Sequence, residues 1–239
     1  MFLSLTRLQL SEEKLDAAAN ALQGALPEYT AHWAVCTVKK GYSGVAVLVR
    51  DGVAVHSVRS DDVGDLNEGR TLTIELKHVW VVCAYVPNSG QDLSRLEYRT
   101  KTWDAALAAH VASLEATGKP VVLIGDLNVA PLDADIWNFM AKHVPKSAGT
   151  TPQERASFAR LVGAAKADAA GGDAAEKTEP YATTLADAFR TLHPDATGEC
   201  YLSLRRATPQ APPTPQVPAL RRCIFVLVDA RRLQPRRLQ

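Results

Sequence analysis

An apolar run that ends in two polar side chains constrains this chain more than any other feature. The run from Pro120 to Val129 places β-favouring residues before Gly125, Asp126 and Asn128. Side chains two positions apart on a strand point the same way, so the carboxylate and the carboxamide should leave the strand side by side. Such a pair can orient a water molecule and donate a hydrogen bond to a phosphoryl oxygen. An ordinary turn, in which the Asx side chains bond their own backbone, is the alternative.

A second apolar run, which begins at Val79, favours a functional interpretation. It becomes polar at its end and brings Tyr85 and Asn88 to a Pro-Asn-Ser-Gly turn. Two buried strands would then carry a phenol, amides and a carboxylate at their ends, where rigid scaffolds commonly hold binding residues. A half-buried tyrosine with a satisfied hydroxyl remains an equally ordinary explanation of Tyr85.

Patterns along the rest of the chain predict a two-sheet α/β sandwich. An amphipathic helix is expected from Ser11 to about Leu26, with Ser11 as its N-cap. Further helices are expected over residues 96–117 and 152–164, and strands over residues 44–50, 53–57 and 71–76. Residues 164–177 have the low complexity of an inserted surface loop.

Length and composition fit one domain followed by a tail. With 239 residues and 46% hydrophobic content, the chain can bury a sizeable single core. We assign residues 1–201 to the domain and residues 202–239 to a Pro- and Arg-rich tail. The tail holds eight arginines and one aspartate, so it carries +7 and leaves −6 for the rest within the overall +1. That basic character suits DNA, but a merely solvated tail explains it equally well.

Cysteine spacing and hydropathy exclude other classes of protein. The four cysteines show no CxxC spacing, which argues against a zinc site or a disulfide framework. No segment reaches the roughly 18 consecutive apolar residues of a membrane span, and the N-terminus is too short for a signal sequence. We therefore expect an intracellular protein with no membrane partner.

Six motifs, in order along the chain, resemble the exonuclease III type, class II apurinic/apyrimidinic (AP) endonucleases. They are Gly41-Tyr-Ser-Gly-Val-Ala-Val-Leu48, Glu68-Gly-Arg70, Ala84-Tyr-Val-Pro-Asn-Ser-Gly90, Arg95-Leu-Glu-Tyr-Arg99 with Trp103, Gly125-Asp-Leu-Asn-Val-Ala130, and Thr151-Pro-Gln-Glu-Arg155 with Phe158. The resemblance covers most of the chain from Leu8 to about Cys200. It implies an α/β sandwich of the endonuclease/exonuclease/phosphatase type that is incomplete at both ends.

The activity implied by the resemblance is hydrolysis of the DNA phosphodiester 5′ to an abasic site, in base-excision repair. A 3′–5′ exonuclease or 3′-phosphodiesterase activity would accompany it. The cofactor would be Mg²⁺, with Mn²⁺ as a substitute, because charge on a pentacoordinate phosphorus must be neutralised. The partner would be double-stranded DNA with abasic sites, and the protein would be a nuclear monomer.

The resemblance also implies roles for individual residues. Tyr85 would contact the scissile phosphate, Asp126 would deprotonate the attacking water, and Asn128 would stabilise the transition state. Asp126 and Asn128 would also be the metal-binding residues. The residues expected to contact DNA are Tyr42, Asn88, Gln91 and Arg95, and Gln91 stands where relatives often place an arginine.

Both ends of the chain depart from this pattern. In the family, a strand ending in Leu-Gln continues into Glu-Thr-Lys, whose glutamate is the principal Mg²⁺ ligand, but here Leu8-Gln9 is followed at once by Leu10. Glu12 and Glu13 are expected in the first turn of the following helix, so the metal glutamate should be missing. The family ends in an Arg-x-Asp-Tyr strand and Ser-Asp-His, whereas no histidine follows residue 193 here.

Three functions therefore remain open. The first is an AP endonuclease, and the second is another phosphoesterase of the same superfamily, which the Thr151 and Arg95 motifs disfavour. The third is a truncated homologue without catalytic activity. In the tail, the run from Cys223 to Val228 has strong β propensity and could pair with the sheet edge that the missing strands leave.

Overall fold

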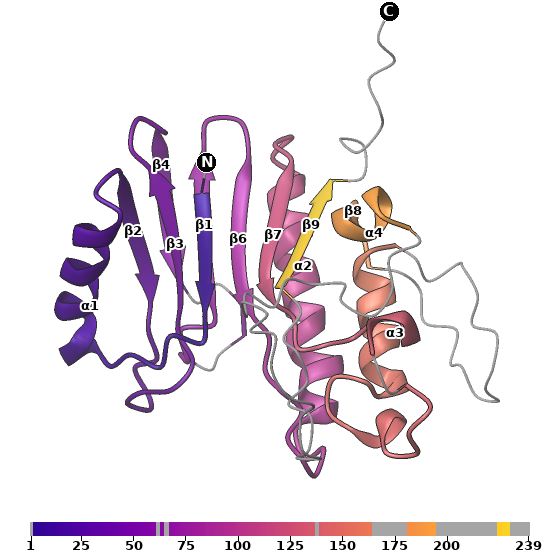
Figure 1. The fold of residues 1–239 in the computed structure, drawn as a ribbon. Helices are drawn as coiled ribbons and strands as arrows, with labels where there is room; N and C mark the ends of the chain where they lie inside the picture. The colour runs from indigo at the N-terminus through magenta and orange to yellow at the C-terminus, as the bar shows by residue number, and fades with distance from the viewer. Residues whose placement is uncertain are drawn as a thin grey trace, which may run out of the picture.

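Two β-sheets with flanking helices form the fold (Figure 1). The computed structural model describes residues 2–60, 63–64, 67–136, 139–163, 181–194 and 224–229. The smaller sheet has the order β1-β3-β2 and the larger one β4-β5-β6-β7-β9-β8. The strands are β1 (Phe2–Thr6), β2 (Tyr29–Ala34), β3 (Val45–Arg50), β4 (Val55–Ser60), β5 (Thr71–Leu76), β6 (Trp80–Tyr85), β7 (Val121–Asp126), β8 (Leu185–Asp187) and β9 (Ile224–Asp229).

The helices lie outside the sheets. Figure 1 shows α1 beside β2 and α2 against the part of the larger sheet that contains β7 and β9. The helices are α1 (Glu12–Ala25), α2 (Asp104–Glu115), α3 (Pro152–Leu161) and α4 (Ala188–Leu192); a π-helical segment η1 (Tyr98–Trp103) leads into α2, and η2 (Asp133–Asp135) and η3 (Val144–Lys146) are 3₁₀ turns.

Alternate side chains of β6 supply two separate cores. Val81 and Cys83 point into the apolar layer between the sheets, whereas Val82 and Ala84 join the layer beneath α2 and α3. This is the two-residue period of a strand that is covered on both faces, and it explains why the run reads as continuously apolar. The larger sheet is therefore the central layer of the molecule.

The parallel pairing of β6 with β7 positions the site. Its register places Tyr85 opposite Asp126, so both side chains emerge at the same end of neighbouring strands. Gly125 makes this close pairing possible, because a Cβ on it would lie 2.0 Å from the carbonyl oxygen of Ala84. Its φ of 133° also lies in a region that side chains rarely adopt.

The sequence-based prediction of a two-sheet α/β sandwich is confirmed. The first and third predicted helices match α1 and α3, and the strand at residues 71–76 matches β5. The predicted helix over residues 96–117 is divided into η1 and α2, and β1, β2, β8 and α4 were not predicted. The loop predicted at residues 164–177 lies outside the described residues.

Part of the predicted tail belongs to the larger sheet. β9 pairs antiparallel with β7 on one side and with β8 on the other. The predicted pairing of the Cys223–Val228 run with a vacant edge is thus confirmed for residues 224–228, and the tail boundary at residue 202 does not separate this strand from the domain. None of the helices in the described ranges has the length and hydropathy to cross a membrane.

Candidate active site

The two carboxylate oxygens of Asp126 have different surroundings. Oδ1 accepts a hydrogen bond of 2.9 Å from the backbone N–H of Asn128, which is the Asx turn expected of Gly-Asp-x-Asn. Oδ2 is buried and has no hydrogen-bond partner among the described residues. A buried acceptor without a partner is costly, so this oxygen is available to bind a proton donor. Oδ1 therefore makes the expected turn, and Oδ2 stays available for the role that the functional interpretation predicts.

Asn128 joins the ends of the two strands. Its φ is 48°, a left-handed conformation that asparagine tolerates better than most residues. Its Nδ2 donates to the carbonyl of Val86 at 2.7 Å, and its Oδ1 lies 3.4 Å from the Nδ2 of Asn88. Asn88 is exposed, and its own Oδ1 accepts from the backbone N–H of Gly90. The two amides form a fixed pair beside Asp126.

Burial raises the pKa of both titratable side chains at these strand ends. For Tyr85, burial and the nearby negative charge of Asp126 raise the pKa, while the charges of Arg7 and Arg70 oppose them. For Asp126, burial raises the pKa, and the Asn128 N–H and the charges of Arg99 and Arg7 oppose it. Asp126 is consequently a stronger base than an ordinary aspartate.

A cluster of charged side chains surrounds Tyr42 next to this site. The guanidinium of Arg70 donates to the Tyr42 hydroxyl at 3.0 Å, and that of Arg95 donates to the same oxygen at 3.2 Å. Glu68 pairs with Arg70 at 2.5 Å and lies 3.8 Å from Arg95. Arg70 also donates to the carbonyl of Tyr85 and lies over its ring at 4.9 Å. It therefore links the predicted DNA-contacting residues to the predicted catalytic ones.

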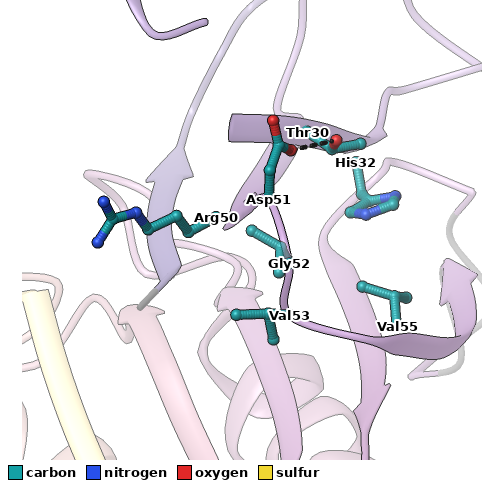
Figure 2. A pocket seen from close by; sticks show the side chains of 8 residues that line it. Thr30, His32, Arg50, Asp51, Gly52, Val53 and Val55 are labelled. Atoms are coloured by element: carbon teal, nitrogen blue, oxygen red, sulfur yellow. Dashed lines mark hydrogen bonds between the residues drawn. The ribbon is translucent and has the colours of Figure 1, made fainter. Parts of the chain in front are cut away.

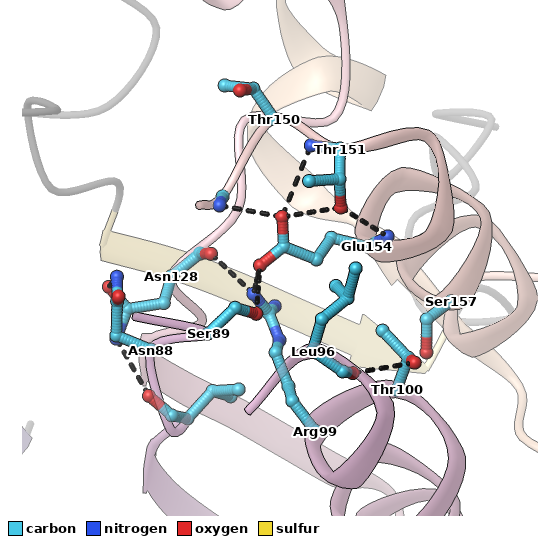
Figure 3. A network of polar contacts seen from close by, with 12 residues as sticks. Asn88, Ser89, Leu96, Arg99, Thr100, Asn128, Thr150, Thr151, Glu154 and Ser157 are labelled. Carbon is cyan, nitrogen blue, oxygen red and sulfur yellow. Dashed lines mark hydrogen bonds and ion pairs between the residues drawn. The ribbon is translucent and has the colours of Figure 1, made fainter. Parts of the chain in front are cut away.

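A buried ion pair holds the loops of the site in place (Figure 3). Arg99, from η1, pairs with Glu154, from α3, at 2.6 Å, and both side chains are almost completely buried. Arg99 also donates to the carbonyl oxygens of Leu127 and Asn128, both at 2.8 Å. Glu154 accepts from the hydroxyl of Ser89 at 2.6 Å, next to Asn88. One pair thus connects two helices to both active-site loops.

Glu154 also closes the N-terminus of its own helix. Thr151 and Glu154 form a capping box, in which each side chain bonds the backbone N–H of the other residue. The sequence Thr-Pro-Gln-Glu carries this signal, whereas the long-range pairing of Glu154 with Arg99 has no local signal.

The structure brings most of the predicted site residues together. Tyr85, Asp126, Asn128 and Asn88 meet at the ends of β6 and β7, and Tyr42 and Arg95 share the adjacent charged cluster. Gln91 is exposed in the turn after Gly90 and makes no side-chain hydrogen bond with the other described site residues. Sequence reasoning assigned no role to Arg7, Glu68, Arg70, Arg99 and Glu154. All of these except Arg7 lie within the motifs quoted above, which is the signal that could have found them.

The residues around Asp126 do not fit a divalent cation. Mg²⁺ takes oxygen ligands in octahedral geometry, but Asp126 offers one free carboxylate oxygen and Asn128 is already bonded to Val86 and Asn88. Within the described ranges, His, Cys, Asp and Glu side chains do not gather in threes to hold a metal ion. The positive charge of Arg7 also acts on this carboxylate. The predicted pair Asp126 and Asn128 does not by itself make a magnesium site.

A pocket of about 240 Å³ lies at the opposite end of the sandwich (Figure 2). It is lined by residues from the end of β3 and the start of β2, among them His32, Arg50 and Asp51. Arg50 is the last residue of β3, which runs antiparallel to β1. The pocket is therefore separate from the ends of β6 and β7.

Comparison with curated proteins finds relatives that are named as nucleases of DNA. The chain is 38% identical over 171 residues to the "DNA repair nuclease APEX1" of Danio rerio, an alignment that covers 71% of this chain and 48% of that protein. It is 34% identical over 199 residues to the "Exodeoxyribonuclease" of Bacillus subtilis (strain 168), covering 79% of this chain and 65% of that protein. The chain thus spans about half to two thirds of these relatives.

Solved structures share the fold. AP endonuclease LMAP from Leishmania major superposes with a TM-score of 0.69 at 24% identity, covering 97% of this chain and 70% of that one. A variant of the 3′ phosphatase NExo from Neisseria, solved with a product DNA hairpin, superposes with a TM-score of 0.67 at 22% identity, covering 97% and 77%. The model of the Endonuclease/Exonuclease/phosphatase family matches residues 9–162. The chain belongs to this family.

Proposed function

We propose that this chain is a DNA repair nuclease of the AP endonuclease type, which hydrolyses the phosphodiester 5′ to an abasic site in double-stranded DNA. The observation that carries the proposal is the free Oδ2 of Asp126, buried at the end of β7 and in register with Tyr85 of β6. A buried base beside a phenol and two amides suits phosphoryl transfer from an ester to water. The names of the relatives support DNA as the substrate.

In the proposed reaction, Oδ2 of Asp126 accepts a proton from a water molecule, and the water oxygen attacks phosphorus. The bond from phosphorus to the 3′ oxygen of the preceding nucleotide breaks, and that oxygen takes a proton from solvent. The products are a 3′ hydroxyl and a 5′ phosphate on the abasic sugar. Tyr85, Asn88 and Asn128 would hold the phosphate, while Arg70 and Arg95 offset its charge.

We expect this hydrolysis to be slow. Nucleases of the family generally use a divalent metal, and the described residues of this chain do not provide the site for one. Removing a single electrostatic stabiliser costs on the order of 10²–10³ in rate. A rate within about tenfold of a full-length relative would contradict this expectation.

Cleavage of a labelled duplex with one abasic site tests the function. The chain should cut on the 5′ side of the lesion, and the Asp126→Asn variant should cut far more slowly. An undamaged duplex and an inositol phosphate serve as comparison substrates; preferred turnover of the inositol phosphate would identify another phosphoesterase of the family. Base-excision repair, a monomeric state and a nuclear location stay predictions from the resemblance.

The second candidate function is binding of abasic DNA without turnover. It is favoured by the lack of a fitting metal site around Asp126 in the described structure. Fluorescence anisotropy with a duplex that carries a stable abasic analogue separates the two candidates. Binding together with an absence of product after long incubation would support the second.

A further inference from the structure

Arg7 occupies the end of a third strand that reaches the active site. Tyr85 and Asp126 are the last residues of β6 and β7, and β1 packs against both of these strands. The carboxyl ends of β1, β6 and β7 lie at the same end of the sandwich (Figure 1). Since β1 ends at Thr6, Arg7 is the first residue that leaves this strand.

The backbone after β1 is held in one conformation. Arg7 and Gln9 both have a φ of 54°, in the left-handed region that such residues rarely adopt. The N–H groups of Leu8 and Gln9 donate to the carbonyls of Gly44 and Ser43 at 3.1 and 2.8 Å. This turn is therefore fixed to the loop that carries Tyr42, and Arg7 is held beside the site.

The side chain of Arg7 is free to bind a ligand. It is exposed and forms no hydrogen bond or ion pair with any described residue. Its charge nevertheless acts on both Asp126 and Tyr85, where it opposes the effect of burial on their pKa values. An exposed guanidinium without a partner, at the strand end next to this site, is suited to an anion.

Acidic side chains do not take the place of Arg7 at this strand end. Glu13, on α1, pairs with Lys40, and Glu12 is exposed on the first turn of the same helix. Glu68 is engaged by Arg70 and Arg95. In the described structure, Asp126 therefore has no second carboxylate beside it to share a divalent cation.

We propose that Arg7 replaces the divalent cation in this chain and binds a phosphate oxygen of DNA beside Asp126. The guanidinium is a fixed positive charge, so the site holds the phosphate group in the absence of a metal. This inference rests on the proposed function, because its ligand is the DNA backbone. It also accounts for slow hydrolysis, since one guanidinium contributes charge but cannot ligate and acidify the attacking water.

A titration with Mn²⁺ tests whether Arg7 replaces the divalent cation. Electron paramagnetic resonance measures the concentration of free Mn²⁺ at each step. The wild-type chain should bind no stoichiometric Mn²⁺, whereas Arg7→Glu should create a site, because it places a second carboxylate beside Asp126. Arg50→Glu, the same change at the far end of β3, should bind as little Mn²⁺ as the wild type. Stoichiometric binding by the wild type, or equal binding by the two variants, would overturn the inference.

Fluorescence anisotropy with an abasic-analogue duplex in EDTA tests whether Arg7 binds a phosphate of DNA. The wild type should bind equally in EDTA and in Mg²⁺. Arg7→Gln should weaken binding in EDTA by up to about tenfold near 0.1 M salt and lower the salt slope by about one, as expected for one lost phosphate contact. Arg50→Gln should leave both values unchanged.

Two further outcomes separate this inference from the proposed function. If Arg7→Gln and the wild type bind DNA with the same affinity and salt slope, Arg7 does not bind phosphate and the inference fails. If the wild type does not bind the duplex at all, the proposed function fails, and the Mn²⁺ comparison still decides whether Arg7 excludes the metal. Inorganic phosphate as a competitor shows whether the anion itself is bound. Urea unfolding of each variant verifies that it is folded.

Discussion

At the scale of single residues, one carboxylate oxygen of Asp126 stabilises the loop and the other is left for the proposed chemistry. Oδ1 stabilises the loop by accepting from the Asn128 N–H, and Oδ2 stays buried without a partner in the described part of the chain. An asparagine could keep the first interaction but could not accept a proton from water. The same side chain thus builds the turn and leaves one oxygen for the proposed role as the base.

Asp126→Asn should reduce cleavage of abasic DNA by about 10²–10⁴, the usual contribution of a general base. Because burial raises the pKa of Asp126, cleavage by the wild type should rise with pH through a pKa above that of an ordinary aspartate and be lost below it. A pH–rate profile of the wild type measures this rise of the cleavage rate with pH. Asp51→Asn, beside the distant pocket, is the control. A variant at Asp126 with wild-type rates would exclude its role as the base.

Gln91→Arg should strengthen binding to an abasic duplex. Gln91 is exposed in the turn next to Asn88, where an arginine would add a cationic contact to DNA and steepen the salt dependence by about one unit. Gln23→Arg adds the same charge on α1 and serves as the control. If affinity and salt slope do not change, Gln91 lies outside the interface.

At the scale of elements, the Arg99–Glu154 pair fixes the relative positions of η1, α3 and the two active-site loops. A π-helical segment within a sequence that predicts a regular helix is often found at functional positions, and here it contains Arg99. Glu154 bonds the N-cap residue Thr151, the guanidinium of Arg99 and the hydroxyl of Ser89 at the same time. The arrangement therefore depends mainly on one buried charged pair.

Glu154→Ala should destabilise the fold by about 3–5 kcal/mol, because it removes the carboxylate 2.6 Å from the buried guanidinium of Arg99 and leaves only Asp104, at 3.9 Å. Replacing both residues with methionine should cost less than the single change, since the buried cation is removed as well and Asp104 keeps its hydrogen bond from Ser157. Urea unfolding measures both values. Glu97→Ala, at an exposed pair with Lys101, should change stability by less than about 1 kcal/mol. A double variant that is less stable than Glu154→Ala would contradict this account.

Local patterns were sufficient for the elements that carry the chemistry but not for their contacts. The β7 run and the capping box of α3 are visible because strand propensity and capping act over a few residues. β1 was missed because its short alternation of Phe2, Ser4 and Thr6 with leucines gives a weak signal. The contacts of Arg70 join residues 15 and 28 positions apart, which only the folded chain brings together.

At the scale of the whole molecule, the charge at the candidate site differs in sign from the net charge of residues 1–200, and the larger sheet includes a strand from the C-terminal segment. Residues 1–200 carry a net charge of −6, yet the described site gathers Arg7, Arg70 and Arg95 around the strand ends. Local clustering can therefore attract a phosphate even where the net charge repels DNA. The larger sheet also depends on the C-terminal segment, because β9 lies between β7 and β8.

The stability of the larger sheet should depend on β9. Leu227 is completely buried in the core beneath α2, whereas its neighbour Val226 on the other face is 42% exposed. Leu227→Ala should cost about 2–5 kcal/mol in the free energy of unfolding, and Val226→Ala on the same strand should cost much less. Deleting residues 220–239 should lower the melting temperature further, because β7 then keeps only β6 as a partner and exposes an unpaired edge on its other side. Urea and thermal unfolding measure these changes; equal stability of all four chains would mean that β9 does not hold the sheet together.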